Sequence, residues 1–389
     1  MISVDAAREA LLRLASDMDF ETIDLRQAGG RVLASDLVAG APQPPFRASS
    51  MDGYALAGPA AVGALLRVVG EAAAGRPSRG AVGPGEAIRI LTGAAVPDSC
   101  DRVVVQEAVR REGDGIRLSA DTSEDDNIRA IGKDFAAGHR LAAGSILTPA
   151  RVALAAAMGH GTVAVRRHPD VAIVMTGDEL TWPSAPLGPG AIHASNGFGL
   201  AAMIDDAGAR ARILPIARDD AAGLAAVLTL ARDADLVLTI GGASVGDHDL
   251  VAEVAADAGL EKAFHGVRMR PGKPLLGGRL GRSVLVGLPG NPVSALVCGS
   301  VFVVPVIRSM LGLPPGPDFA TRPLAHQIPA NGGREHYMRA RREPDGRVSV
   351  FESQDSSLLS VLSEADLLVR RLPDDPAREP GAMMDTLLL

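Results

Sequence analysis

The sequence has few cysteines, no excess of positive charge and no signal peptide, and each shortage excludes a class of protein. Only two cysteines occur in 389 residues, Cys100 and Cys298, and they lack CxxC spacing, so neither a disulfide framework nor a cysteine zinc site is indicated. The net charge is -7, whereas a nucleic-acid-binding face normally shows as a basic excess. The N-terminus lacks the basic region and apolar core of an export signal. We therefore expect a cytoplasmic protein that does not bind nucleic acid.

Long apolar runs and the common nucleotide-binding motifs are also missing. The longest uncharged apolar run, residues 293–307, is shorter than the ~20 residues that span a bilayer and contains Pro305. We expect a buried helix there and no membrane partner. Neither GxxxxGK followed by Ser or Thr nor GxGxxG occurs, which disfavours ordinary P-loop and dinucleotide sites.

Strand-like and helix-like segments alternate between residues 170 and 311. This alternation predicts a doubly wound, mostly parallel α/β sheet. The expected strands are residues 171–176, 211–216, 236–240 and 283–288, and the expected helices are residues 195–207, 220–232, 249–258 and 292–311.

The rest of the chain predicts three smaller parts, so the expected fold class is multidomain α/β. An opening helix over residues 3–16, with Ser3 as its N-cap, is expected to pack against a helix that begins at Pro149. Short extended runs broken by Gly and Pro predict a β-rich inserted module and a β-rich C-terminal part. The expected domains are residues 1–40 with 139–166 (small helical or linker), 41–138 (β-rich insertion), 167–315 (α/β) and 316–389 (C-terminal, β-rich).

The segment from residue 234 to residue 250, ADLVLTIGGASVGDHDL, is the one around which we expect the α/β domain to be organised. Five consecutive apolar or β-branched residues, 236–240, are typical of a central strand covered on both faces. The glycines that follow tolerate positive φ and allow a ligand close to the backbone. Asp249, at the start of the next helix, adds a carboxylate, and carboxylates beside a polyphosphate usually bind a divalent cation. The alternative is a glycine-rich turn whose aspartates only cap the helix.

Acidic and amide side chains follow the neighbouring strands as well. Asp178 and Glu179 follow the first strand, and Asp219 and Asp220 follow the second. Ligands bind beyond the carboxyl ends of the strands in such sheets, so a ligand or metal role is expected for this set. Helix capping is the alternative, and it applies equally to Asn196.

Two further segments are suited to an anion. The turn PGNP places Gly290 and Asn291 at a helix N-terminus, with Ser294 in the first turn, where free N–H groups attract negative charge. A short loop held by two prolines carries three cations, Arg268, Arg270 and Lys273. In a net acidic protein we expect this loop to face an anion rather than solvent alone.

Three polar residues of the β-rich module lie in turns and have no apolar neighbourhood that would explain them as packing. They are Asp52 in SSMDGYAL, Thr92 in TGAAVP and Asp134 in the GKD turn.

The order and spacing of seven motifs resemble the MoeA-like molybdopterin molybdenumtransferases, the family that includes the gephyrin E domain. The motifs are PPFRASSMDGYAL, RILTGAAVP, GKD, VMTGDEL, GGASVGDHD, PGKP and GLPGNPVSA. The resemblance implies an enzyme of molybdenum cofactor biosynthesis that inserts molybdenum from molybdate into adenylylated molybdopterin, with magnesium-dependent release of AMP. It also implies that residues 167–315 are the molybdopterin-binding domain and that residues 316–389 form a β-barrel-like domain.

The resemblance implies site residues by position. Those expected to matter for catalysis are Asp52, Thr92, Asp134, Glu179, Asp219 and Asp249. Those expected to contact the pterin phosphate or nucleotide are Gly241, Gly242, Ser244, Gly246, Pro271, Lys273, Gly290, Asn291 and Ser294, to which Asn196 and Arg270 are added from their places in the sequence. We expect Glu179 and Asp249 to position Mg²⁺ and Asp219 to orient the nucleophile.

The resemblance further implies a homodimer with a shared active site, in which Asp52 acts on the other chain, and a molybdopterin adenylyltransferase as pterin donor. The sequence departs from the family at Lys133, where an acid is usual, and at Gly266, where a lysine is common. Two other hypotheses stay open: adenylylation of molybdopterin by ATP, and a non-catalytic scaffold that binds molybdopterin.

Overall fold

The computed structural model describes residues 1–119, 125–242 and 250–389. They form two compact units, one of residues 1–21 with 166–389 and the other of residues 22–165. Each unit is described by itself below. The limits of the four expected domains stay a prediction.

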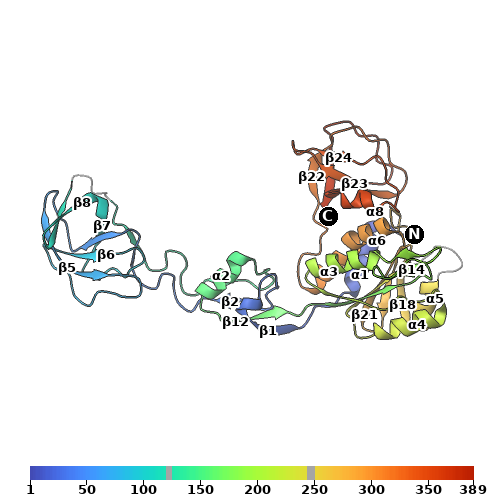
Figure 1. Ribbon diagram of the computed structural model, residues 1–389, viewed down its shortest axis with the longest axis horizontal. Helices are drawn as coiled ribbons and strands as arrows, with labels where there is room; N and C mark the ends of the chain where they lie inside the picture. The colour runs from blue at the N-terminus through green and yellow to red at the C-terminus, as the bar shows by residue number, and fades with distance from the viewer. Residues whose placement is uncertain (120–124, 243–249) are drawn as a thin grey trace. The chain divides into compact units, whose positions relative to one another are not determined.

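The first unit contains a six-stranded sheet in the order β16-β13-β17-β21-β20-β18 (Figure 1). Its first four strands are the predicted ones, and they pair in parallel. All five residues of β17, in the middle of the sheet, are buried, as the apolar run predicts. The strands are β13 (Asp170–Met175), β16 (Arg210–Ile213), β17 (Leu236–Ile240), β18 (Leu260–His265), β20 (Leu276–Leu280) and β21 (Ser283–Leu288).

The antiparallel strands β18 and β20 were not predicted. The sequence of β20, LGGRL, hides the strand because its two glycines lack the side chains that mark β structure. The structure gives a reason for Gly277: a Cβ there would lie 2.4 Å from the ring of Phe264 and 2.9 Å from Leu11. Close packing therefore requires glycine at this position.

Helices cover both faces of this sheet (Figure 1). On one face, α4 and α5 pack their apolar side chains against alternate residues of the strands. On the other face, α3 lies against β13 and α6 against β21, while α1 contacts β20 and α7. The helices are α1 (Val4–Leu14), α3 (Asn196–Asp206), α4 (Ala221–Leu230), α5 (Leu250–Asp257), α6 (Pro292–Cys298) and α7 (Val304–Met310).

The apolar helix predicted at residues 292–311 is confirmed as a core helix. It consists of α6, a π-helical turn η3 (Gly299–Val303) and α7. By length and composition the helix Pro292–Met310 could cross a membrane, but 72% of its apolar window is buried inside the fold. Its apolar character is therefore explained by packing.

The opening helix α1 begins as predicted but packs elsewhere. The Ser3 hydroxyl accepts a hydrogen bond from the backbone N–H of Ala6 at 3.2 Å, which caps the helix. Its apolar face, Val4, Ala7 and Leu11, is buried on the β18–β20 hairpin and α7. The prediction that it packs against the helix beginning at Pro149 is wrong, because the apolar face that would make this contact is already buried on the α/β sheet and α7.

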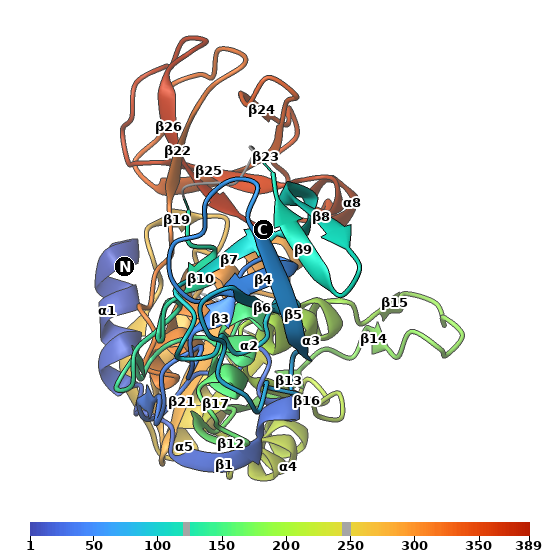
Figure 2. The same ribbon diagram turned by 90° about the vertical axis from the view of Figure 1, so that its left-hand side faces the viewer.

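The C-terminal segment forms a second six-stranded sheet in the first unit, as its short extended runs predict (Figure 2). A bridge between Leu324 and Val348 links β22 back to β24, so the sheet curls on itself. Strand β19, from the cationic loop, pairs with β23 and so belongs to this sheet. The elements are β19 (Met269–Arg270), β22 (Ala320–Pro323), β23 (Glu335–Arg342), β24 (Val348–Val350), α8 (Leu359–Ser363), β25 (Leu367–Arg371) and β26 (Met383–Leu388).

The second unit is β-rich, as predicted. Its main sheet has the order β7-β4-β6-β5-β9-β8 and is covered by apolar clusters on both faces. These strands are β4 (Gly53–Leu56), β5 (Leu65–Ala72), β6 (Glu86–Ile90), β7 (Arg102–Val105), β8 (Val109–Glu112) and β9 (Gly115–Leu118).

The part of the second unit that was expected to be helical is mostly short strand pairs around one α-helix, α2, among the described residues. The expectation of a helical domain was wrong because its other helix, α1, packs on the α/β sheet. The remaining elements are η1 (Leu25–Gln27), β2 (Leu37–Val38), β3 (Ala48–Ser49), η2 (Gln106–Ala108), β10 (Ile128–Arg129), β11 (Arg140–Leu141) and α2 (Pro149–Ala157), with β1 (Phe20–Asp24) paired to β12 (Thr162–Arg166).

Candidate functional site

A cavity of about 130 Å³ lies at the carboxyl ends of β13, β17 and β21. Four of the predicted residues line it together: Glu179, Asn196, Gly241 and Gly290. Gly241 has φ of 88°, and a Cβ there would lie 2.6 Å from the carbonyl oxygen of Thr176. Only glycine therefore allows the tip of β17 to approach β13 so closely.

Thr176 gives this cavity an unused polar group. Its side chain is 3% exposed, lines the cavity and has a hydroxyl that finds no hydrogen-bond partner among the residues that the structure describes. A buried hydroxyl without a partner costs stability unless a ligand or water satisfies it. Thr176 was assigned no role from the sequence, although it lies within the VMTGDEL motif.

Asn196 braces the cavity rather than capping a helix through its side chain. Its amide nitrogen donates a hydrogen bond to the carbonyl oxygen of Gly290 at 2.7 Å. The capping residue of α3 is Ser195, and Ser195 makes no side-chain capping bond. Asn196 therefore fixes the turn after β21 against the start of α3.

The acids that follow β16 divide into two roles. The carboxylate of Asp220 accepts a hydrogen bond from the N–H of Gly223 at 2.7 Å, so the capping alternative holds for Asp220. The backbone N–H of Asp219 donates to the carboxylate of Asp178 at 3.3 Å. Asp219 is thus beside the residue that precedes Glu179 but does not line the cavity.

The glycine-rich turn after β17 is only partly described. Gly242 follows Gly241 with φ of 62°. Ser244, Gly246 and Asp249 lie outside the described residues. Within the described ranges, no group of three or more His, Cys, Asp or Glu side chains is placed to hold a metal ion.

A second cavity, of about 360 Å³, brings together five more of the predicted anion-binding residues, whereas Arg268 does not line it. The five residues are Arg270, Pro271, Lys273, Asn291 and Ser294. Since Gly290 lines the first cavity and Asn291 the second, the PGNP turn separates the two.

Four more residues that line the second cavity come from the C-terminal part of the chain and were not predicted. They are Arg334, Gln354, Asp355 and Ser356. The Ser356 hydroxyl accepts a hydrogen bond from the Asn291 amide at 3.1 Å, and its carbonyl accepts one from the N–H of Val293. The C-terminal segment therefore completes the cavity.

Three cations face this cavity without an ion-pair partner among the described residues: Arg270, Lys273 and Arg334. The charges of Arg270 and Arg334 act on His336, which pairs with Arg270 in the sheet. Burial, and then nearby arginines, first of all Arg270, lower the pKa of His336 from 6.5 to about 4. The second cavity is therefore a region of positive potential suited to an anion.

The lowered pKa of His336 predicts a loss of stability in mild acid. Below pH 6.5 the unfolded chain takes up a proton that the folded chain accepts only near pH 4. The contribution of His336 to the free energy of unfolding is complete above pH 6.5. It is lost as the pH falls toward 4, a change of about 3 kcal/mol at most. Denaturant unfolding between pH 7.5 and 4.5 measures it.

His336→Gln is the control, because glutamine does not titrate in this range. We expect a flatter dependence of the unfolding free energy on pH in this variant than in the native protein. Equal slopes in the two proteins would contradict the assignment.

In the second unit, Asp52 and Thr92 form a pair. The Asp52 carboxylate accepts hydrogen bonds from both the hydroxyl and the backbone N–H of Thr92, each at 2.7 Å. These two bonds, the hydroxyl first, lower the pKa of Asp52 below its usual value. Two residues that are far apart in the sequence thus present one exposed, ionised carboxylate.

Asp134 lies at a separate opening of the same unit. A cavity of about 570 Å³ is lined by Lys133, Asp134, Arg129 and Gly93, the residue after Thr92. Lys133 and Asp134 therefore contribute opposite charges to this opening.

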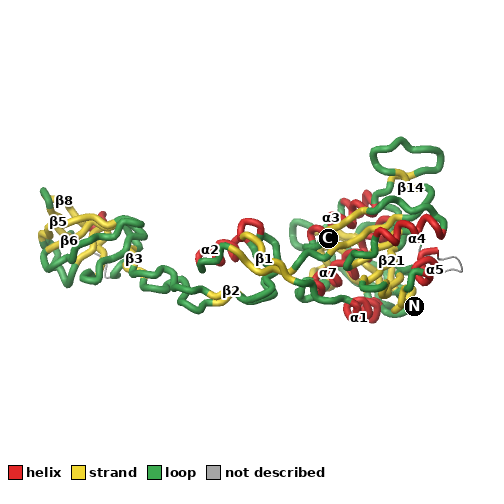
Figure 3. The backbone as a smooth tube through the Cα atoms, turned by 90° about the horizontal axis from the view of Figure 1, so that it is seen from below, coloured by secondary structure: helices red, strands yellow, loops and turns green. Residues whose placement is uncertain are grey.

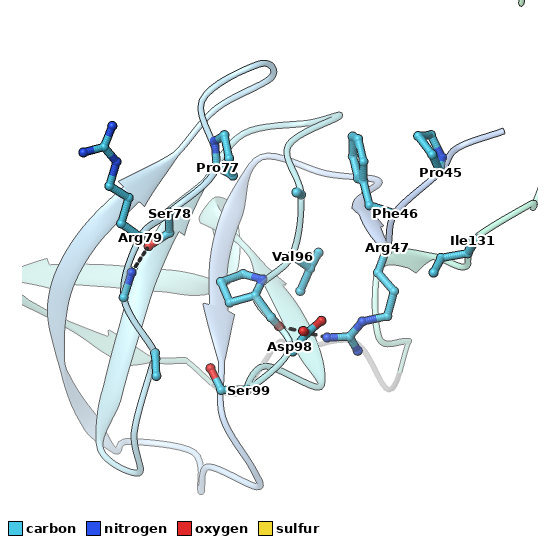
Figure 4. Close-up of a pocket in the computed structure, with 14 residues that line it drawn as sticks. Pro45, Phe46, Arg47, Pro77, Ser78, Arg79, Val96, Asp98, Ser99 and Ile131 are labelled. Carbon is cyan, nitrogen blue, oxygen red and sulfur yellow. Dashed lines mark hydrogen bonds between the residues drawn. The ribbon is translucent and has the colours of Figure 1, made fainter. Parts of the chain in front are cut away.

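A neighbouring cavity of about 550 Å³ shares Phe46 with it (Figure 4). The Arg47 guanidinium donates to the carbonyl oxygens of Pro97 and Cys100 at 2.8 and 2.7 Å, while Arg79 extends away from Arg47. Because its cations do not converge, this cavity is poorly suited to a compact anion.

Models of three protein families match most of the chain. Residues 2–159 match the MoeA N-terminal region (domain I and II), residues 172–309 match a probable molybdopterin binding domain, and residues 321–389 match the MoeA C-terminal region (domain IV). The three matches follow one another in the order of the motifs.

Curated relatives and solved structures agree with these matches. A molybdopterin molybdenumtransferase of Nostoc sp. is 36% identical over 84% of this chain and 78% of its own length. A molybdopterin molybdenumtransferase 2 of Mycobacterium tuberculosis is 38% identical over 82% of each chain. The crystal structure of a molybdopterin biosynthesis MoeA protein from Pyrococcus horikoshii covers 100% of both chains, with a TM-score of 0.85 and 28% identity.

Proposed function

Since the chain belongs to the MoeA family of molybdopterin molybdenumtransferases, we propose that it inserts molybdenum from molybdate into adenylylated molybdopterin and releases AMP. One observation carries the proposal: the PGNP turn lines both a cavity with the Glu179 carboxylate and a cavity with three cations that lack an ion-pair partner in the described part of the chain. The cavity with the carboxylate can hold a cation bound to phosphate, and the cavity with the cations can hold an oxyanion next to it.

The second cavity supports the role of molybdate as substrate. Molybdate is a tetrahedral dianion, and Arg270, Lys273 and Arg334 supply charged donors around one space. The Asn291 amide and the Ser294 hydroxyl add neutral donors on the same wall. We propose that molybdate binds there.

The first cavity supports the pyrophosphate end of the substrate. The backbone of Gly241 and Gly290 and the hydroxyl of Thr176 surround a space that Glu179 also lines. A lone carboxylate would repel a polyphosphate, so Glu179 is better explained as the ligand of a cation bound with it.

Mg²⁺ fits this donor set. It usually binds through one or two carboxylates together with substrate phosphates, and Glu179 supplies one carboxylate among the described residues. We propose that Glu179 and Asp249 hold it. When bound, Mg²⁺ neutralises the pyrophosphate and polarises its phosphorus.

The chain's own residues would then position the reacting groups. The bond that breaks is the phosphoanhydride between AMP and the molybdopterin phosphate, and the attacking oxygen comes from molybdate or water. We assign to Asp219 the orientation of this oxygen, because it lies beside Asp178, next to Glu179 in the chain.

We further propose a cytoplasmic homodimer with a shared active site, to which the Asp52–Thr92 pair of one chain contributes in trans, and a molybdopterin adenylyltransferase as the donor of the pterin. The family resemblance of the motifs around Asp52 and Thr92 supports this. The ionised state of Asp52 is consistent with a role at a charged site.

The test is incubation of the purified protein with adenylylated molybdopterin, Mg²⁺ and molybdate. We expect AMP release that depends on molybdate. A scaffold would release no AMP, and an adenylyltransferase would release none that depends on molybdate, so either result would refute the proposed transfer.

A further inference from the structure

A loop projects from the α/β unit beside the first cavity, between residues 182 and 191 (Figures 2 and 3). Its base is the pairing of β14 (Leu180–Thr181) with β15 (Ile192–His193). Leu180 and Ile192 line the cavity, so the loop starts and ends at the cavity wall. We call residues 182–191 the projecting loop.

The loop begins with an aromatic residue, Trp182, two residues after Leu180 of the cavity wall. Trp182 follows β14, and its ring meets the ring of Phe198 edge to face, with centroids 6.0 Å apart and an interplanar angle of 86°. Phe198 lies in the first turn of α3, two residues after Asn196, which also lines the cavity. The tryptophan and phenylalanine are 39% and 42% exposed. Rings exposed to this extent leave aromatic surface on which a planar ligand can stack.

The backbone around Trp182 is held in place. The N–H of Ala185 donates to the carbonyl of Trp182 at 2.9 Å, and that of Ala191 donates to Gly188 at 3.1 Å. Prolines at 183, 186 and 189 restrict the loop further. At the base, the N–H of Ile192 donates to the carbonyl of Glu179 at 2.8 Å. A ligand that binds an already ordered ring pays little conformational entropy.

The first cavity is too small to hold a whole organic substrate, so part of the substrate needs a binding surface outside it. Its volume of about 130 Å³ is well below the ~300 Å³ at which pockets for organic ligands begin. Under the proposed function the substrate carries a pterin and an adenine in addition to the pyrophosphate. If its phosphates lie beside Glu179, at least one of these rings must lie outside the cavity.

We propose that Trp182, supported by Phe198, is the stacking surface for a planar nitrogen heterocycle of the substrate. This inference rests on the proposed function and adds a binding subsite to it. Pterin and adenine share the required chemistry, a flat and polar aromatic ring, and every such ring can stack on an indole face.

The test uses the fact that Trp182 is the only tryptophan in the chain. The emission of the native protein is followed during separate titrations with 6-hydroxymethylpterin and with AMP. We expect saturable quenching by at least one of them. Quenching by the pterin assigns the pterin ring to Trp182, and quenching by AMP assigns the adenine. No saturable quenching by either compound would overturn the proposal.

Because a pterin can quench tryptophan by energy transfer without contact, the affinity is also measured by calorimetry in variants. Trp182→Ala is expected to weaken binding of the quenching compound by about tenfold, the effect of losing one stacking partner. Trp182→Phe should retain most of the affinity. Leu187→Ala, in the same loop and 52% exposed in the native protein, is the matched control and should bind normally.

The outcomes separate this subsite from the function it serves. Native AMP release together with unchanged ligand affinity in Trp182→Ala would overturn the stacking site and leave molybdenum transfer in place. Normal affinity in Leu187→Ala with a tenfold loss in Trp182→Ala would support the stacking site whether or not AMP release depends on molybdate.

Discussion

Replacing Glu179 by Gln is expected to lower molybdate-dependent AMP release on the order of 100-fold, the scale seen when one electrostatic stabiliser of a reaction is removed. The reason is that glutamine keeps the size of the side chain but removes the charge that would hold the cation beside the pyrophosphate. Glu179 is exposed at the tip of β13, so the variant should fold normally. Single-turnover measurement of AMP release, with thermal unfolding in parallel, checks both parts.

Glu261→Gln is the matched control for this prediction. Glu261 is an exposed acid on β18, the edge strand of the same sheet on the side away from β13. Its removal should leave AMP release unchanged. The same loss as in Glu179→Gln is expected for Asp249→Asn, with pterin binding largely intact. AMP release at the native rate in either site variant would remove the role assigned to that residue.

Mixing two inactive variants tests the proposal that the two chains of a dimer share each active site. Random exchange of subunits between Asp52→Asn and Glu179→Gln would produce dimers in which one of the two sites is intact. Roughly a quarter of the native AMP release should return if Asp52 acts in trans in a twofold dimer. No recovery after verified subunit exchange would show that both residues act within one chain.

Replacing Arg371 by Ala is expected to lower the stability of the C-terminal sheet by about 1–3 kcal/mol, the cost of leaving buried acceptors unsatisfied, because the Asp375 carboxylate keeps its second partner, Arg378. The Arg371 guanidinium is 1% exposed, pairs with the Asp375 carboxylate and donates to the carbonyl oxygens of Pro329 and Pro376. In the variant, the two carbonyl oxygens and the carboxylate lose the hydrogen bonds that the Arg371 guanidinium donates. Hydrogen exchange of the amides of β23 and β25 measures the loss.

Arg347→Ala is the control for the buried pair. Arg347 bonds Asp345 at 2.7 Å, but both side chains are about half exposed, at 48% and 49%. An exposed pair of this kind contributes roughly 0–1 kcal/mol, so little change is expected. Arg371→Lys should recover only part of the stability, because an ammonium cannot donate to three acceptors in the same planar arrangement. Equal effects of Arg371→Ala and Arg347→Ala would contradict the argument.

The sequence predicted the parts of the site that depend on neighbours in the chain. The buried run 236–240 became the central strand, and the residues after β13, β17 and β21 face one cavity because parallel strands end at the same edge. The cationic loop and the PGNP turn were each predicted to bind an anion. Both line the second cavity. Asp52 and Thr92, chosen separately, are joined by two hydrogen bonds.

The parts that sequence inspection missed depend on residues distant in the chain. The wall formed by Arg334 and residues 354–356 exists because β19 pairs with β23, which no local pattern encodes. In the sequence, a buried arginine such as Arg371 cannot be told from a surface residue. Its burial is possible because carbonyl and carboxylate groups from other parts of the chain accept its hydrogen bonds. The opening helix α1 was assigned to the wrong partner for the same reason.

The sequence by itself determined where strands, helices and close-approach glycines occur, because periodicity and backbone sterics act over a few residues. Only the tertiary structure decided which charged groups share a cavity and that the Trp182 side chain near the first cavity stays exposed. Those outcomes depend on strand pairing and on desolvation by distant segments, and both are fixed only when the whole chain has packed.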